Sequence, residues 1–289
     1  MDIERECSSG IEDRLNLAKG KMQEVPIYFI DAFASQPFRG NPAAVCILEP
    51  DHGHSDQWMQ NVAIEVKHSE TAFVVPQTGS LRWFTPGGEV DLCGHATVAT
   101  AVALEAAGLA SSGDTLQFQT RSGQLSAELL PCGAIELNFP STPPESIENI
   151  EAIAGSFPNA VGVYQSRFDL LVELPSEQDV IDYEPDFETI GKLEFRGVMI
   201  TAASERPEVD FVSRFFAPRF GVDEDPVTGS AHCCLTPFWS EKLGKTEMKA
   251  EQLSKRGGEV DIVLLGDRVK LRGSAVVIIE GKLFVHANP

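Results

Sequence analysis

Basic residues and long apolar stretches are what this sequence of 289 residues has least of. It contains 23 Lys and Arg against 43 Asp and Glu, which gives a formal net charge of −20 at pH 7. A surface with this charge repels the phosphates of nucleic acids and anionic lipid headgroups, so neither is expected as a partner. The longest nearly apolar run, residues 96–109, is shorter than the roughly 20 residues that cross a bilayer. We therefore expect a soluble protein without a membrane segment.

Patterned cysteines and cofactor motifs are absent as well. The six cysteines show neither C-x-x-C spacing nor the density of a short disulfide-rich domain. No Gly-rich dinucleotide fingerprint, Walker motif or metal-ligand cluster occurs, so we expect no cofactor and no metal. Residues 1–25 are polar and lack the apolar segment of a signal peptide. We expect them to form a poorly ordered extension of a cytoplasmic protein.

What the sequence does contain predicts a large α/β (α+β) fold. Hydrophobic residues make up 43% of the chain, enough for a core, and the length exceeds that of one typical domain. Nearly apolar helices are expected over 96–107 and 231–243, and such helices belong in the interior. Further helices are expected over 145–157 and over the acidic stretch 176–194. Pro143-Pro144 separates half-domains over 26–141 and 142–282, and a strand near 283–289 could return to the first half.

A repeated motif relates the two halves. Arg82-Trp83-Phe84-Thr85-Pro86 and Arg214-Phe215-Phe216-Ala217-Pro218 share the pattern Arg, aromatic, Phe, small residue, Pro. Each motif is followed by an acidic loop, a glycine with a polar residue (Gly94-His95 or Gly229-Ser230), and an apolar helix. We interpret this as an internal duplication, with each half a barrel-like, mostly antiparallel sheet around one central helix. Equivalent helix N-termini are then expected to face each other across a cleft.

The paired helix starts are candidates for an anion site. The first amides of a helix lack intrahelical partners and carry partial positive charge, and glycine admits a ligand close to the backbone. Two such ends would hold a small carboxylate without Arg or Lys. Glu70, His95 and Asp225 stand near them in the pattern, although each also has a purely structural interpretation. A carboxylate facing an apolar pocket has its neutral form favoured and can exchange protons near neutral pH.

Six motifs, in this order, resemble the PhzF-like phenazine-biosynthesis isomerase family and its mammalian relatives, the MAWD-binding proteins. They are Asp31-Ala32-Phe33, Gly40-Asn41-Pro42-Ala43-Ala44-Val45, Ser69-Glu70-Thr71-Ala72-Phe73-Val74, Arg82-Trp83-Phe84-Thr85-Pro86, Cys93-Gly94-His95-Ala96-Thr97 and Glu224-Asp225-Pro226-Val227-Thr228-Gly229-Ser230-Ala231. The resemblance runs from about residue 27 to the C-terminus. It implies the diaminopimelate-epimerase fold, in which two duplicated halves enclose the site.

The resemblance also implies roles for individual residues. In the best-known members the glutamate moves a proton during isomerisation of a dihydro-hydroxyanthranilate, and the other catalytic residues hold or polarise the substrate. The catalytic positions fall here on Glu70, His95, Asp225 and Ser230. The substrate-binding positions expected beside them are Asn41, Ser69, Gly94, Thr228 and Gly229. The expected partner is a small carboxylate substrate, and a homodimer is the assembly to test.

Two alternatives remain beside a cofactor-independent isomerase that uses Glu70 as base and acid. Cysteine-dependent epimerases of this fold use one thiol from each half. Cys93 resembles the first, but Pro226 stands at the second place, which disfavours a Cys93-dependent racemase or epimerase. The other alternative is a non-catalytic, protein-binding family member. The presence of all four catalytic positions argues against it.

Overall fold

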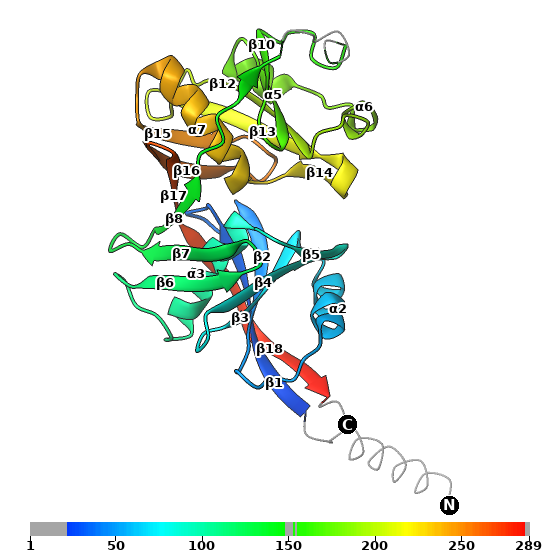
Figure 1. Cartoon of the computed structure of the whole chain (residues 1–289), viewed down its shortest axis with the longest axis vertical. Coiled ribbons are helices and arrows are strands. Elements are labelled where there is room, and N and C mark those ends of the chain that lie inside the picture. The colour runs from blue at the N-terminus through cyan, green and yellow to red at the C-terminus, as the bar shows by residue number, and fades with distance from the viewer. Residues whose placement is uncertain (1–21, 148–152, 154, 287–289) are drawn as a thin grey trace, which may run out of the picture.

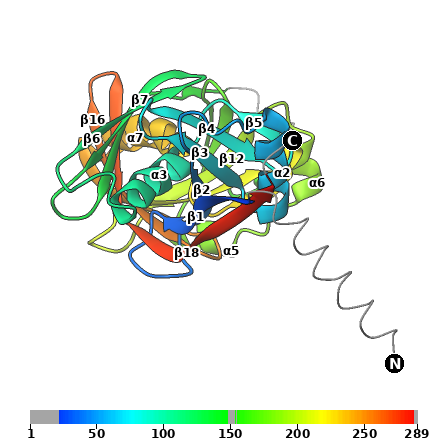
Figure 2. The same ribbon diagram turned by 90° about the horizontal axis from the view of Figure 1, so that it is seen from below.

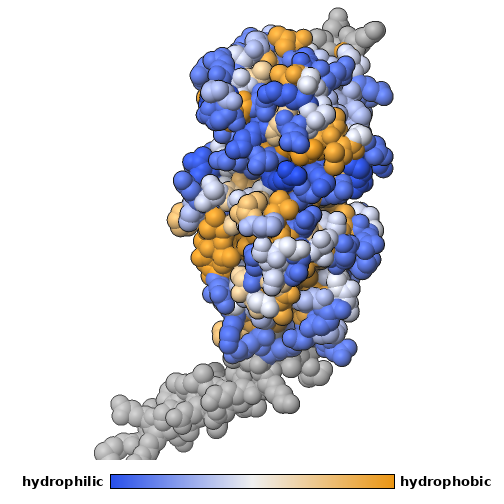
Figure 3. Space-filling model, turned by 90° about the vertical axis from the view of Figure 1, so that its left-hand side faces the viewer, coloured by the Kyte–Doolittle hydropathy of each residue, from blue (hydrophilic) through white to orange (hydrophobic). Residues whose placement is uncertain are grey.

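Two stacked lobes of similar construction make up the molecule (Figure 1). The computed structural model describes residues 22–147, 153 and 155–286, so most of the expected N-terminal extension lies outside the described residues. A constriction marks the boundary between the lobes on the surface shown in Figure 3. Within the described residues, no helix has the length and apolar character needed to span a membrane.

The first lobe is a mixed sheet with two helices. Strands β2 and β3 are parallel, and β3, β4 and β5 then follow as antiparallel neighbours. Helix α3 contacts β1, β2, β3, β7 and β8, and Figure 2 shows it surrounded by strands of this lobe. The elements are β1 (Met22–Ala32), β2 (Asn41–Ile47), α2 (Asp56–Val66), β3 (Glu70–Val75), β4 (Ser80–Thr85), β5 (Gly88–Val90), α3 (Gly94–Ala106), β6 (Thr115–Thr120), β7 (Gly123–Leu129) and β8 (Ile135–Pro140).

The second lobe repeats this order of pairings. Strands β11 and β12 are parallel, and β12, β13 and β14 are antiparallel neighbours. Helix α7 packs on β15, β16 and β17. The elements are β9 (Glu145–Ser146), β10 (Gly162–Gln165), β11 (Asp169–Glu173), α5 (Glu177–Asp182), α6 (Phe187–Gly191), β12 (Gly197–Ala203), β13 (Phe211–Ala217), the 3-10 turn η1 (Pro218–Phe220), β14 (Val222–Asp225), α7 (Gly229–Leu243), β15 (Glu247–Gln252), β16 (Gly258–Leu265) and β17 (Arg268–Gly273).

The arginines of the repeated motif make matching contacts in the two lobes. Arg82 Nε and Nη2 donate to the two carboxylate oxygens of Glu89, both at 2.8 Å. Arg214 Nε and Nη2 donate to those of Glu224, at 2.7 and 3.1 Å. Each guanidinium also lies 5.1 Å from the ring centre of the phenylalanine two residues further along the chain. These contacts support the interpretation of a duplication at the level of side chains.

The last strand differs from the expected boundary. Strand β18 (Ala275–His286) pairs with β1 along its whole length, from Ala275 opposite Ala32 to His286 opposite Met22. The chain therefore returns to the first lobe at Ala275 rather than near 283, and β1 begins inside the expected extension. One edge of the long strand β1 pairs with β2. Strand β18 pairs with the other edge and satisfies its backbone N–H and C=O groups.

Two expected helices also differ from the structure. In the stretch 145–157, Glu145–Ser146 form a short strand on β10, and residues 148–152 and 154 lie outside the described residues. The acidic stretch 176–194 divides into α5 and α6. Pro185 lies between them, and proline disfavours helical conformation in the residue before it. Ser176 and Asp186 then cap the two short helices separately.

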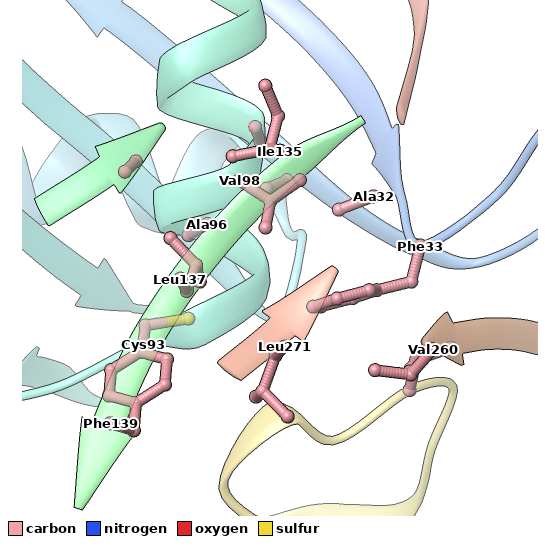
Figure 4. Close-up of a cluster of buried hydrophobic side chains, with 14 of the residues drawn as sticks. Ala32, Phe33, Cys93, Ala96, Val98, Ile135, Leu137, Phe139, Val260 and Leu271 are labelled. Carbon is pink, nitrogen blue, oxygen red and sulfur yellow. The ribbon is translucent and has the colours of Figure 1, made fainter. Parts of the chain in front are cut away.

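One hydrophobic core extends through both lobes. It includes buried residues of both central helices, and the lobes meet where Leu137 and Phe139 of β8 lie beside Leu271 of β17 (Figure 4). Strands β8 and β17 pair along this boundary. Because apolar side chains and a strand pair join the lobes, we infer that the groups at their boundary are held in fixed positions.

Candidate active site at the lobe boundary

The two central helices begin next to each other. Helix α3 starts at Gly94 and α7 starts at Gly229. A Cβ atom built on either glycine would lie 3.7 Å from the Cα atom of the other. The expected meeting of the helix starts is therefore present in the structure. Both N-termini carry partial positive charge, so their first amides form a region suited to an anion.

His95 is the centre of a cluster contributed by three segments of the first lobe. Its ring is buried, and its Nε2 atom lies 3.1 Å from Glu70 Oε2 and 3.3 Å from Ser69 Oγ. Its Nδ1 atom lies 3.2 Å from Asn41 Nδ2. Strands β2 and β3 run parallel from this point, which places their first residues, Asn41 and Glu70, beside the start of α3. The fold thus brings four of the expected site residues into contact.

Asn41 connects this cluster to the second lobe. Its Nδ2 atom donates to Asp225 Oδ1 at 2.8 Å and to Val227 O at 2.9 Å. Asp225 Oδ2 also accepts a 2.5 Å hydrogen bond from Thr228 Oγ1. Asp225 and Thr228 are therefore part of the same hydrogen-bonded group as Glu70 and His95.

Gln252 supports the second-lobe part of the group, and sequence reasoning did not identify it. Its Oε1 atom accepts from Thr228 N at 2.9 Å, and its Nε2 atom donates to Asp225 O at 2.7 Å. A single glutamine in a late strand gives no motif from which this role could be predicted. Gln252 fixes the turn from β14 into α7.

Ser230 has a different partner from the other expected catalytic residues. Its Oγ atom accepts a 3.0 Å hydrogen bond from Arg196 Nη2. Arg196 in turn forms a two-pronged ion pair with the buried Asp169. Neither residue belongs to a motif that sequence reasoning singled out. Arg196 adds a cation to a site that was expected to work without one.

The match to a known protein family extends over most of the chain. The family of phenazine biosynthesis-like proteins, PhzC-PhzF, matches residues 30–281. This chain belongs to that family. The family resemblance inferred from the six motifs is thereby confirmed.

Relatives and solved structures agree with the PhzC-PhzF assignment. An uncharacterized isomerase of Halalkalibacterium halodurans is 48% identical, over 91% of this chain and 100% of its own length. The crystal structure of a PhzF-family phenazine biosynthesis protein from Enterococcus faecalis has a TM-score of 0.85 at 39% identity, covering 91% of this chain and 100% of that chain. A protein of Pseudomonas aeruginosa described as a predicted epimerase shares the fold, with a TM-score of 0.72 at 17% identity over 90% of this chain and 99% of its own. The predicted fold and enzyme class, an isomerase, are confirmed.

The two carboxylates of this PhzC-PhzF site have pKa values that are shifted in opposite directions. Burial tends to raise the pKa of Glu70, but the adjacent His95 outweighs it and holds that pKa below its usual value. Burial tends to lower the pKa of His95, but Cys93 and Glu70 raise it well above its usual value. Burial raises the pKa of Asp225 to about 6, against the opposing effect of His95. A carboxylate that exchanges protons near neutral pH needs a raised pKa. In this site Asp225 has the raised pKa, and Glu70 does not.

Cys93 lies in the same cluster without a matching thiol. Its Sγ atom is 3.5 Å from His95 Nδ1, and burial, followed by the charge of Glu70, raises its pKa. Each lobe has one residue that caps its central helix immediately before the glycine, and these are Cys93 and Thr228. By its position before the glycine, Thr228 is the residue of the second lobe that corresponds to Cys93, and Pro226 lies two residues earlier. With a hydroxyl at that position, none of the described cysteines provides Cys93 with a partner thiol.

Three ligand types meet within this cluster. Single ligand atoms of Glu70, Cys93 and His95 all lie within 4.8 Å of one another. Carboxylate, thiolate and imidazole are zinc ligands in proteins. A zinc ion would require Cys93 as a thiolate, whereas burial favours its protonated form.

Proposed function

We propose that this chain is a cofactor-independent isomerase that moves a proton on a small carboxylated substrate. The observation that carries the proposal is the position of Glu70. Its carboxylate is paired with His95 at 3.1 Å, close to the point where the two helix N-termini meet. A base that is kept ionised beside an anion site can remove a proton from a carbon next to a bound carboxylate.

The reaction then has two steps. One Glu70 oxygen accepts the proton as the C–H bond breaks, and the electron pair moves into the neighbouring unsaturated system and carboxylate. The first amides of α3 and α7 stabilise the negative charge that develops there. Glu70 then returns the proton to another carbon, which shifts the double bond and restores the base. No atom is gained or lost, as an isomerisation requires.

The other expected site residues position and polarise the substrate in this proposal. His95 keeps Glu70 ionised, Ser69 Oγ lies within hydrogen-bond distance of His95 Nε2, and Asn41 holds Asp225. Asp225, with its pKa of about 6, can donate a hydrogen bond to a substrate oxygen when protonated. The proposal also includes a cytoplasmic location and a homodimer. Light scattering on the purified chain tests the homodimer.

A Cys93-dependent racemase or epimerase is the second candidate, since the thiol lies 3.5 Å from His95. The raised pKa of Cys93 and the hydroxyl of Thr228 at the equivalent place both favour the Glu70 mechanism. A non-catalytic binding protein is disfavoured because Glu70 pairs with His95 at the same lobe boundary where Asn41 binds Asp225, which is the arrangement expected of a reaction site.

Deuterium exchange tests the proposal before the natural substrate is known. Small cyclic and unsaturated carboxylic acids are incubated with the protein in D2O, and carbon-bound deuterium is followed by NMR. We expect exchange with wild type and an at least 100-fold slower rate with Glu70→Gln, because losing a general acid-base typically costs about 10²–10⁴-fold. Glu173→Gln is the matched control, because Glu173 pairs with Lys242 in the second lobe away from the site. Exchange at the wild-type rate in Glu70→Gln would remove Glu70 from the mechanism.

A further inference from the structure

The strand pairings of the two lobes identify equivalent residues. In the first lobe Arg82 lies opposite Phe73 of β3, and in the second lobe Arg214 lies opposite Ile200 of β12. Counting back along β3 and β12 from these positions makes Gly197 the equivalent of Glu70. The residue before each is then also equivalent: Ser69 in the first lobe and Arg196 in the second.

Ser69 and Arg196 make the same contact in their lobes. Ser69 Oγ lies 3.3 Å from the ring of His95, which is the second residue of α3. Arg196 Nη2 lies 3.0 Å from Oγ of Ser230, which is the second residue of α7. The duplication therefore places Arg196 on the second-lobe side of the site, where the first lobe has a neutral hydroxyl.

The guanidinium of Arg196 is held in a fixed orientation. Asp169, only 2% exposed, accepts from its Nε at 2.9 Å and from its Nη2 at 2.5 Å. The aromatic rings of Phe168 and Phe215 lie 5.3 and 5.9 Å from its central carbon. The two N–H groups of Nη2 are used by Asp169 and Ser230. Among the described residues, Nη1 has no hydrogen-bond partner, and the side chain is 38% exposed.

The Ser230 hydroxyl is oriented by the same contact. Because Arg196 donates to Ser230 Oγ, the hydroxyl hydrogen must point toward a different acceptor. No acceptor for it is found within the part of the chain that the structure describes. Two donors, Arg196 Nη1 and the Ser230 hydroxyl, are thus available to one ligand.

We propose that Arg196 and Ser230 bind the carboxylate of the substrate from the second lobe, across from the base Glu70. This inference rests on the proposed function and specifies how the acid is recognised. A fixed guanidinium is well suited to a carboxylate because its charge is permanent, and here Nη1 can donate to one carboxylate oxygen while the Ser230 hydroxyl donates to the other. It also offsets the repulsion that an acid meets in a chain with a net charge of −20.

Binding of matched acids and amides tests this role. Benzoate and cyclohex-1-ene-1-carboxylate are titrated calorimetrically against the full chain, each beside its uncharged amide. Wild type is expected to bind the acids at least 10-fold more tightly than the amides. Arg196→Gln combined with Asp169→Asn, which avoids leaving a buried unpaired carboxylate, is expected to lose at least 10-fold in acid affinity and nothing in amide affinity, since hydrogen bonds to charged groups contribute roughly this much.

A neighbouring cation provides the control. Arg167 lies 4.9 Å from the ring of Phe168 but has no contact with Ser230 in the described residues. Arg167→Gln should leave acid affinity within twofold, which separates a specific contact from general attraction. If the double variant keeps the preference for acids, the role of Arg196 is wrong while the Glu70 mechanism stands. If wild type shows no preference for acids, the carboxylate class of substrate is contradicted together with Arg196.

Discussion

In the first lobe the strand before the repeated arginine motif begins with Glu70, whereas the equivalent strand of the second lobe begins with Gly197. A Cβ atom at Gly197 would lie 2.2 Å from the ring of Phe215, so packing requires glycine there. The first lobe has a partly exposed carboxylate at the same place, paired with His95. Equivalent positions of the two lobes thus provide a charged base on one side of the boundary and a glycine packed against an aromatic ring on the other.

The arginines of the repeated motif are expected to contribute different amounts to the free energy of unfolding. Arg214 is 12% exposed and also donates to the carbonyl of Tyr183 at 2.7 Å, whereas Arg82 is 27% exposed and reaches the exposed Asp56 instead. We expect Arg214→Met to lower the free energy of unfolding by about 4 kcal/mol, because it leaves Glu224 poorly solvated and unpaired. Arg82→Met should cost about 1 kcal/mol. Urea unfolding of both variants measures this, and equal costs would show that the lobes are energetically equivalent here.

The carboxylates at the boundary differ in the sign of their response to pH. The pKa of Asp225 is raised to about 6 from 3.8, so its stabilising contribution is present below pH 4 and is lost as pH rises through 6. At pH 7 the free energy of unfolding of Asp225→Asn should therefore exceed that of wild type, by up to about 3 kcal/mol. The difference between the two proteins should shrink as pH falls from 6 to 4. A difference that does not change over this range would contradict the raised pKa.

Cys93, which precedes the glycine of α3, should show the smallest effect on activity. Cys93→Ala is expected to keep deuterium-exchange activity within about threefold, since a protonated, buried thiol contributes little as a base or nucleophile. Alkylating reagents should inactivate wild type slowly, because the side chain is buried. Rapid, stoichiometric inactivation that a carboxylic acid prevents would instead favour the epimerase mechanism.

Much of the fold could be predicted because its determinants are local. The two central helices have almost continuous apolar sequences, and the arginine motifs recur with the same elements after them. The apolar spacing of the acidic stretch 176–194 predicts one helical segment. Its division into α5 and α6 follows from Pro185 and separate caps, which outweighed that spacing.

The duplication, the two buried helices with their glycine starts and, through the family motifs, the identities of the site residues can all be inferred from the amino-acid order alone. Which of these residues come into contact depends on folding: Asn41 donates to Asp225 across the lobe boundary, and Arg196 donates to Ser230. The ionisation of the site was also decided there. A pKa depends on burial and on charges contributed by distant segments, and neither is present until the chain has folded. Glu70 and Asp225 are both carboxylates in the sequence, but in the folded chain the contact with His95 holds the pKa of Glu70 down, whereas burial raises the pKa of Asp225.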